Sequence, residues 1–195
     1  HNKLNNNLTS PSGVNIHFKQ EYQSSNIINK NSKISEICYF QEDQWKIGRA
    51  EMLYRDLIVS RFMNTIIASH IKIPKGGAVN DRVHYHKIDF QIIFCIKGWV
   101  KVIYEDQGDL ININAGDCVL QSPEIRHRVV EASNELEVIE VTLPSNHLTK
   151  FDYKTQLPTG MINRNKLFNG MKFCYFDLNK SIKNIYEGAN NFYHK

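Results

Sequence analysis

Hydrophobic and polar residues follow one another in short runs through the middle of the chain. Seven such runs are rich in β-branched and aromatic residues, and turn residues such as Gly98 and Gly116 separate them. They cover residues 83–86, 90–97, 100–105, 110–113, 117–121, 127–131 and 136–143. Short strands at regular spacing are typical of an all-β barrel or sandwich.

The flanking segments have different patterns. Residues 1–33 are rich in Asn, Ser and Lys without periodicity, which predicts a flexible N-terminal arm because so little apolar surface cannot offset the ordering entropy. The predicted barrel covers 34–144 and includes further strands at 50–57 and 65–73. We expect 145–195 to be a C-terminal extension that packs on the barrel or on a partner subunit. Within this extension, a strand is expected over 171–178 and a short helix over 180–187.

Composition restricts the class of protein. The 195 residues are 42% hydrophobic and 23% charged, as in a soluble globular domain. No apolar run reaches the roughly 18 residues of a membrane span. The net charge of +4 is spread along the chain, without the basic stripe that nucleic-acid binding needs. The four cysteines form no CxxC pair and no secretory segment opens the chain, so we expect buried thiols in the cytoplasm.

Three histidines and a glutamine carry the candidate chemistry. His84 and His86 are two residues apart on a predicted strand, so both imidazoles lie on one face. Gln91 lies on the next predicted strand, and His127 lies on a predicted strand that is distant in the sequence. Three imidazoles and an amide oxygen would supply four ligands to a divalent metal and leave two positions open.

The spacing of these residues resembles the two motifs of the cupin superfamily, G(x)5HxH(x)3,4E(x)6G and G(x)5PxG(x)2H(x)3N. The first motif keeps its spacing here as His84-x-His86-x4-Gln91-x6-Gly98, and the second keeps the spacing from Gly116 to His127. The chain is similar to small single-domain bacterial cupins of unassigned function. The resemblance implies a jelly-roll β-barrel, a metal site at His84, His86, Gln91 and His127, and a homodimer to which residues 34–57 could add strands.

Gln91 departs from the family pattern, which has glutamate at this position. Glutamine leaves the site charge at +2, so that an anionic substrate is held more strongly while hard cations bind more weakly. Gln91 is then either a direct fourth ligand or a neighbour of a metal held by three histidines. In a third reading, no metal binds in the cell. Fe(II) is the metal we favour, and Mn, Ni, Cu and Zn remain open.

Four other residues are candidates for the site. Glu140 shares strand parity with apolar residues, and it is either an inward-facing general acid or base or a surface glutamate. Arg128, beside His127, either holds a substrate carboxylate or faces outward. By parity, His70 and Cys95 are expected to line the substrate pocket.

These features support several function classes. We expect a metal-dependent enzyme that acts on a small anionic metabolite, with dioxygenase chemistry favoured because similar proteins have three-histidine iron sites. A metal-dependent lyase or isomerase is the next alternative. A non-catalytic small-molecule binder or sensor is the third, although no helix-turn-helix pattern accompanies the barrel. A scaffold protein would instead have a filled barrel.

Overall fold

The computed structural model describes residues 7–9, 15–17 and 37–181, and it forms two compact units, 1–35 and 36–195. In the first unit, β1 (Asn7–Thr9) pairs antiparallel with β2 (Asn15–His17). The segment predicted as a flexible arm therefore contains a short two-stranded ladder, and its other residues lie outside the described ones.

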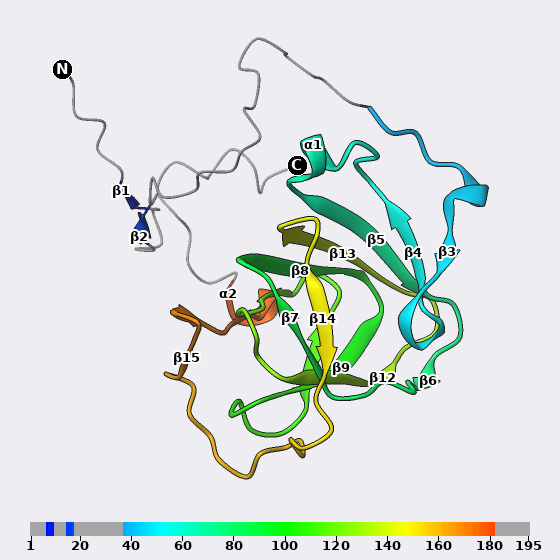
Figure 1. Cartoon of the computed structure of the whole chain (residues 1–195). Coiled ribbons are helices and arrows are strands. Elements are labelled where there is room, and N and C mark those ends of the chain that lie inside the picture. The colour runs from blue at the N-terminus through cyan, green and yellow to red at the C-terminus, as the bar shows by residue number, and fades with distance from the viewer. Residues whose placement is uncertain (1–6, 10–14, 18–36, 182–195) are drawn as a thin grey trace, which may run out of the picture. The chain divides into compact units, whose positions relative to one another are not determined.

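The second unit consists of two antiparallel sheets that enclose a barrel (Figure 1). The larger sheet has the order β17 (Cys174–Phe176), β11 (Cys118–Leu120), β8 (Phe90–Lys97), β13 (Leu136–Leu143), β5 (Ile67–Ile73), β4 (Leu53–Asp56) and β3 (Lys46–Ile47). The other has the order β10 (Ile111–Asn114), β9 (Trp99–Tyr104), β12 (His127–Ala132), β7 (His84–Lys87) and β14 (Leu148–Phe151), with β6 (Gly77–Ala78) also on β12. The predicted all-β jelly roll is confirmed.

The remaining elements are short. They are the 3-10 turns η1 (Glu42–Gln44) and η2 (Arg49–Glu51), the helices α1 (Arg61–Asn64) and α2 (Leu178–Ser181), and the ladder of β15 (Leu167–Phe168) with β16 (Met171–Lys172). Among the described residues, no helix is long and apolar enough to cross a membrane.

The seven predicted runs correspond to β7 to β13. The bounds of β8 and β13 are those predicted, and the other strands differ by one residue at one or both ends. Gly98 makes the turn from β8 to β9 with a φ of +76°. A Cβ there would lie 2.1 Å from the Ser133 Oγ, so both the backbone conformation and the close approach require glycine.

The flanking segments are more closely joined to the barrel than the sequence predicted. β14 pairs with β7 and β17 pairs with β11, so the segment after residue 144 adds a strand to each sheet. At the other end, β4 pairs with β5 of the same chain. The predicted helix over 180–187 is α2 as far as Ser181, and the rest of it lies outside the described residues.

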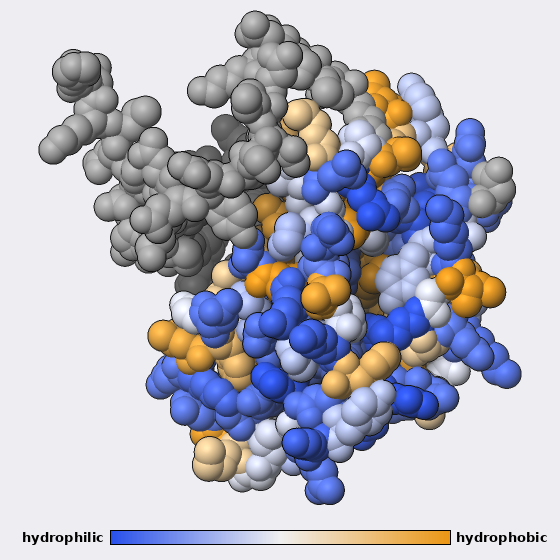
Figure 2. Space-filling view, in the orientation of Figure 1, coloured by the Kyte–Doolittle hydropathy of each residue, from blue (hydrophilic) through white to orange (hydrophobic). Residues whose placement is uncertain are grey.

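The core lies between the two sheets. Cys95 and Val119 have no exposed surface, and the rings of Tyr104 and Phe173 pack with their centroids 4.6 Å apart. Burial of such side chains stabilises the fold by roughly 1.5–3 kcal/mol each. On the face seen in Figure 2, hydrophobic residues form separate small groups between hydrophilic ones.

Candidate metal centre and cavity

Two neighbouring strands bring the three histidines together. β7 carries His84 and His86 on its inward face, and the register of β12 places His127 directly opposite His84. All three side chains are buried, and their possible ligand atoms lie within 4.8 Å of one another. The ring centroids of His84 and His127 are only 4.2 Å apart. Such a cluster of imidazoles is a suitable ligand set for Fe, Ni, Cu or Zn.

Hydrogen bonds on the outer side of each ring determine which nitrogen can bind a metal. The Nδ1 atoms of His84 and His127 donate to the carbonyl oxygens of Arg82 and Ile125, at 2.7 and 2.9 Å. Because a carbonyl only accepts, these Nδ1 atoms carry the proton and each Nε2 keeps its lone pair. The Nδ1 of His86 is hydrogen bonded to the Thr149 Oγ1 at 2.8 Å.

The buried Nε2 of His84 has no hydrogen-bond partner among the described residues. An unpaired buried polar atom costs free energy, and a metal ion would satisfy it. The residues therefore fit a metal. Burial lowers the pKa of all three histidines, and their mutual repulsion lowers the pKa of His86 and His127 further, to about 2 for His86. The imidazoles are thus neutral at pH 7, the form that binds a metal.

Gln91 lies beside the triad and is 1% exposed. Its Oε1 accepts a hydrogen bond from the Nε2 of Gln121 at 2.6 Å, and the same nitrogen lies 3.3 Å from the His127 Nε2. Gln121 was not identified from the sequence, although it ends a predicted strand in the second motif. A carboxamide oxygen has two lone pairs, so this bond leaves both readings of Gln91 open.

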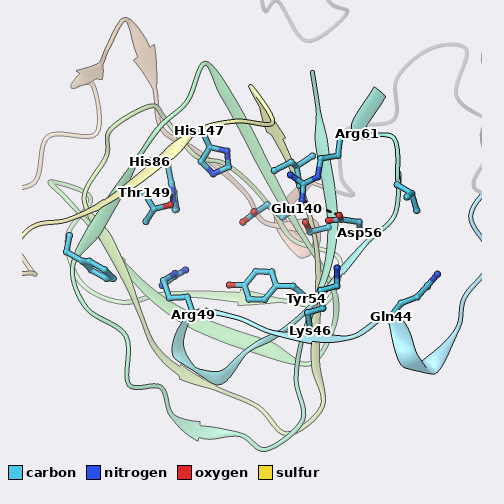
Figure 3. Close-up of a pocket in the computed structure, with 14 residues that line it drawn as sticks. Gln44, Lys46, Arg49, Tyr54, Asp56, Arg61, His86, Glu140, His147 and Thr149 are labelled. Atoms are coloured by element: carbon cyan, nitrogen blue, oxygen red, sulfur yellow. Dashed lines mark hydrogen bonds and ion pairs between the residues drawn. The ribbon is translucent and has the colours of Figure 1, made fainter. Parts of the chain in front are cut away.

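A cavity of about 770 Å³, the outer cavity, opens beside the triad (Figure 3). Its wall includes His86, Thr149, His147 and Glu140. A second space of about 70 Å³, the inner chamber, lies within the barrel, and its wall is mainly apolar. Four residues line both spaces and form the neck between them: Arg49, Tyr54, His86 and Glu140.

Glu140 lines both spaces from β13, which is one of the two positions that the sequence left open. It lies opposite Ser69 of β5 and Ile93 of β8 in the register of the sheet. Burial raises the pKa of its carboxyl group, while Arg49 and the side chains of Gln91 and Thr142 act in the opposite direction. A carboxyl group with a raised pKa in the same cavity wall as His86 is a candidate proton donor and acceptor.

Arg49 and Asp81 form an ion pair at the cavity that the sequence did not reveal. Asp81 is 8% exposed and also accepts a hydrogen bond from the Val129 backbone N–H at 2.9 Å. Arg49 begins the 3-10 turn η2 and Asp81 lies in a loop. The alternation of side chains along a strand therefore does not predict where these two side chains point. The only signal in the sequence was a pair of opposite charges 32 positions apart.

The structure places three predicted substrate-binding residues outside the walls of both spaces. His70 lies on the outer face of β5, bound to Arg55 at 3.0 Å and to Glu137 at 2.9 Å, because its neighbour Ser69 is the residue that faces the cavity. Cys95 is fully buried in the core, where its Sγ donates to backbone carbonyls of the Gly98 turn. Arg128 follows an inward-facing residue on β12 and therefore points away from the barrel interior.

Comparison with known proteins identifies the fold. No protein-family model and no curated protein matches the sequence. Among solved structures, the polyketide cyclase RemF from Streptomyces resistomycificus superposes with a TM-score of 0.50 at 15% identity, over 64% of this chain and 91% of RemF. KdgF from Halomonas sp. gives 0.45 at 17% identity, over 57% of this chain and 94% of KdgF.

An oxalate decarboxylase from B. subtilis gives a TM-score of 0.46 at 13% identity, and the matched region is only 33% of its length. At these identities, the comparisons define the fold alone. The chain has the fold of the cupin superfamily, which confirms the resemblance seen in its motifs.

Proposed function

We propose that the protein is a metal-dependent enzyme that acts on a small anionic metabolite. The observation that carries the proposal is the buried triad of His84, His86 and His127, of which His86 lines a cavity together with the partly buried Glu140. An interaction scaffold would have no cavity at the histidines, whereas a cavity of about 770 Å³ opens beside this triad. Fe(II) is the favoured metal, with Mn, Ni, Cu and Zn as alternatives.

The residues of the neck support proton-transfer chemistry. A bound metal would supply Lewis acidity to a substrate oxygen. Glu140 holds or accepts the transferred proton at its carboxylate, and the apolar wall of the inner chamber keeps water away. This combination favours a lyase or isomerase. The dioxygenase expected from the sequence remains the second candidate, because the ligand triad has no carboxylate and three imidazoles suit Fe(II).

Metal content is the first test. We expect near-stoichiometric metal in wild-type protein purified without chelators or a histidine tag, measured by elemental analysis. His84→Ala should lose it, because two imidazoles remain. His70→Ala is the matched control, since His70 lies on the outer face, and it should keep the metal. Protein that contains no metal and takes none up on reconstitution would contradict the proposal and favour a non-catalytic binder.

The reaction class is tested by a screen of small oxo- and hydroxy-carboxylates in air and under nitrogen. Turnover that persists under nitrogen indicates lyase or isomerase chemistry, while turnover that requires and consumes O2 indicates a dioxygenase. Glu140→Gln should lower kcat about 100-fold or more for proton transfer, without loss of metal. An unchanged kcat would exclude Glu140 as the acid or base.

A further inference from the structure

Arg49 occupies a special place at the neck. Of the described residues, four border both the outer cavity and the inner chamber. Arg49 is the one of these four with a permanent positive charge. In Figure 3, the tips of Arg49 and Tyr54 point toward one another, below His86 and Glu140. A ligand bound where the two spaces meet therefore lies near both His86 and the guanidinium group of Arg49.

An ion pair with Asp81 holds the guanidinium group of Arg49 in place. Its Nη1 donates to the Oδ1 of Asp81, and that aspartate is held by the backbone N–H groups of Arg82 and Val129, each at 2.9 Å. The Asp81 side chain is 1% exposed, whereas the Arg49 side chain is 28% exposed at the cavity. The ion pair uses one guanidinium nitrogen, whereas the whole group has five N–H donors in a planar fork. The pair thus holds a guanidinium with further N–H donors at the cavity, while Asp81 offsets its charge.

The backbone around Arg49 adopts conformations that side chains disfavour. Ala50 and Glu51 have φ values of 53° and 62°, in the left-handed region. A Cβ on Gly48 would lie 2.6 Å from the Tyr54 ring, so only glycine allows the turn to lie against that tyrosine. Strain of this kind is typical of sites where a side chain must be held in a defined position.

We infer that Arg49 binds the anionic group of the substrate, and that this group is a carboxylate. The fork of the guanidinium matches the two oxygens of a carboxylate. Of the other cations of the outer cavity, Arg61 pairs with Asp56 at 3.3 Å, and Lys46 lies on the exposed strand β3 opposite Tyr54. The inner chamber, walled by residues such as Ile71, Val102 and Leu136, has room only for a small apolar group. The substrate class is therefore a short carboxylate, an inference that rests on the proposed function.

The test is calorimetric titration of zinc-reconstituted protein with malonate, and with the neutral malonamide. Arg49→Gln should weaken malonate binding about 10- to 100-fold, the range for a lost hydrogen bond to a charged group, and should leave malonamide unchanged. Arg49→Lys keeps the charge without the planar fork, so its affinity for malonate should lie between those of the wild type and Arg49→Gln. Arg128→Gln, an arginine outside the barrel, is the matched control and should bind malonate like the wild type. Zinc content and thermal unfolding are measured for every variant.

The outcomes separate the inference from the proposed function. If zinc is retained and malonate binds the wild type and Arg49→Gln equally, or binds neither, the inference is wrong and the metal site stands. If the wild type takes up no zinc, the proposed function is wrong; the inference survives only if metal-free protein binds malonate in an Arg49-dependent way. If Arg49→Gln does not fold, Arg49→Lys decides by the same criterion.

Discussion

At the scale of single residues, the histidines of the triad differ from ordinary buried histidines in the use of their two ring nitrogens. Each Nδ1 is bound on the outer side, to a backbone carbonyl for His84 and His127 and to a hydroxyl for His86. The Nε2 of His84 remains without a partner among the described residues. The strands thereby orient the rings before any ion binds, which lowers the cost of forming a metal site.

Gln91 is the residue whose substitution should change the metal preference. Gln91→Glu places a carboxylate where cupins have one and lowers the formal site charge from +2 to +1, so hard cations bind better. We expect Mn(II) affinity to rise about tenfold or more, with a smaller gain for Zn(II), measured by competition with a chelator. Gln121→Glu is the comparison, because the Gln121 side chain is bonded to Gln91 and its Nε2 lies 3.3 Å from the His127 Nε2. Equal changes for both metals would contradict a role of Gln91 at the ion.

At the scale of elements, the turn after β14 is attached to the barrel by charged side chains. Asp152 accepts hydrogen bonds from the backbone N–H groups of Lys154 and Thr155 and from the Arg126 Nε at 3.1 Å. Arg126, immediately before β12, also lies over the ring of Tyr85 on β7, 4.4 Å from its centroid. These contacts connect three neighbouring strands on the outer face of the sheet that carries the triad.

The same contacts predict a dependence of stability on pH. Hydrogen bonds from Thr155 and Lys154, with that from Arg126, hold the pKa of Asp152 well below its usual 3.8. A depressed pKa means that the folded state binds the proton less well than the unfolded state. The stabilisation is therefore present above pH 3.8 and is lost as the pH falls below that value.

Asp152→Asn should consequently lower the free energy of unfolding at pH 7 by about 1–2 kcal/mol. In urea unfolding curves recorded across this range, the difference in free energy of unfolding between the variant and the wild type should shrink as the pH falls below 3.8. Asp109→Asn, an exposed acid, serves as the control. A difference that stays constant with pH would show that the charge of Asp152 contributes nothing.

At the scale of the whole barrel, the segment after β14 completes the core. Phe168 and Phe173 are each 6% exposed and pack in the same hydrophobic cluster as Tyr104 and Val119. Tyr104 in turn stacks on the ring of His127 at 5.6 Å. The C-terminal segment therefore supports the triad through two layers of aromatic rings.

Phe173→Ala should destabilise the protein by about 3–5 kcal/mol, because it leaves a cavity between the sheets. Phe176→Ala, three residues further on and 48% exposed, is the matched control and should cost less than about 1 kcal/mol. Thermal or denaturant unfolding measures both. Equal small effects would show that the segment after residue 144 only covers a barrel that is stable without it.

The sequence alone determined the features that depend on local periodicity. A period of two places His84 and His86 on one face, and the same rule gives Glu140 the strand parity of the buried Leu136 and Val138. The bounds of β8 and β13 follow from apolar runs between turn residues. Side chains on a regular strand alternate whatever the neighbouring strands are, so this part of the site was predictable.

Only the tertiary structure decided the rest. Parity does not say which of two alternating faces is the inner one, and β5 carries apolar residues on both, so His70 was placed on the wrong face. Cys95 does face inward, but it is fully buried in the core and does not line the cavity. Arg49, Asp81 and Gln121 reach the site from turns and strand ends. Their directions depend on long-range contacts that periodicity does not encode.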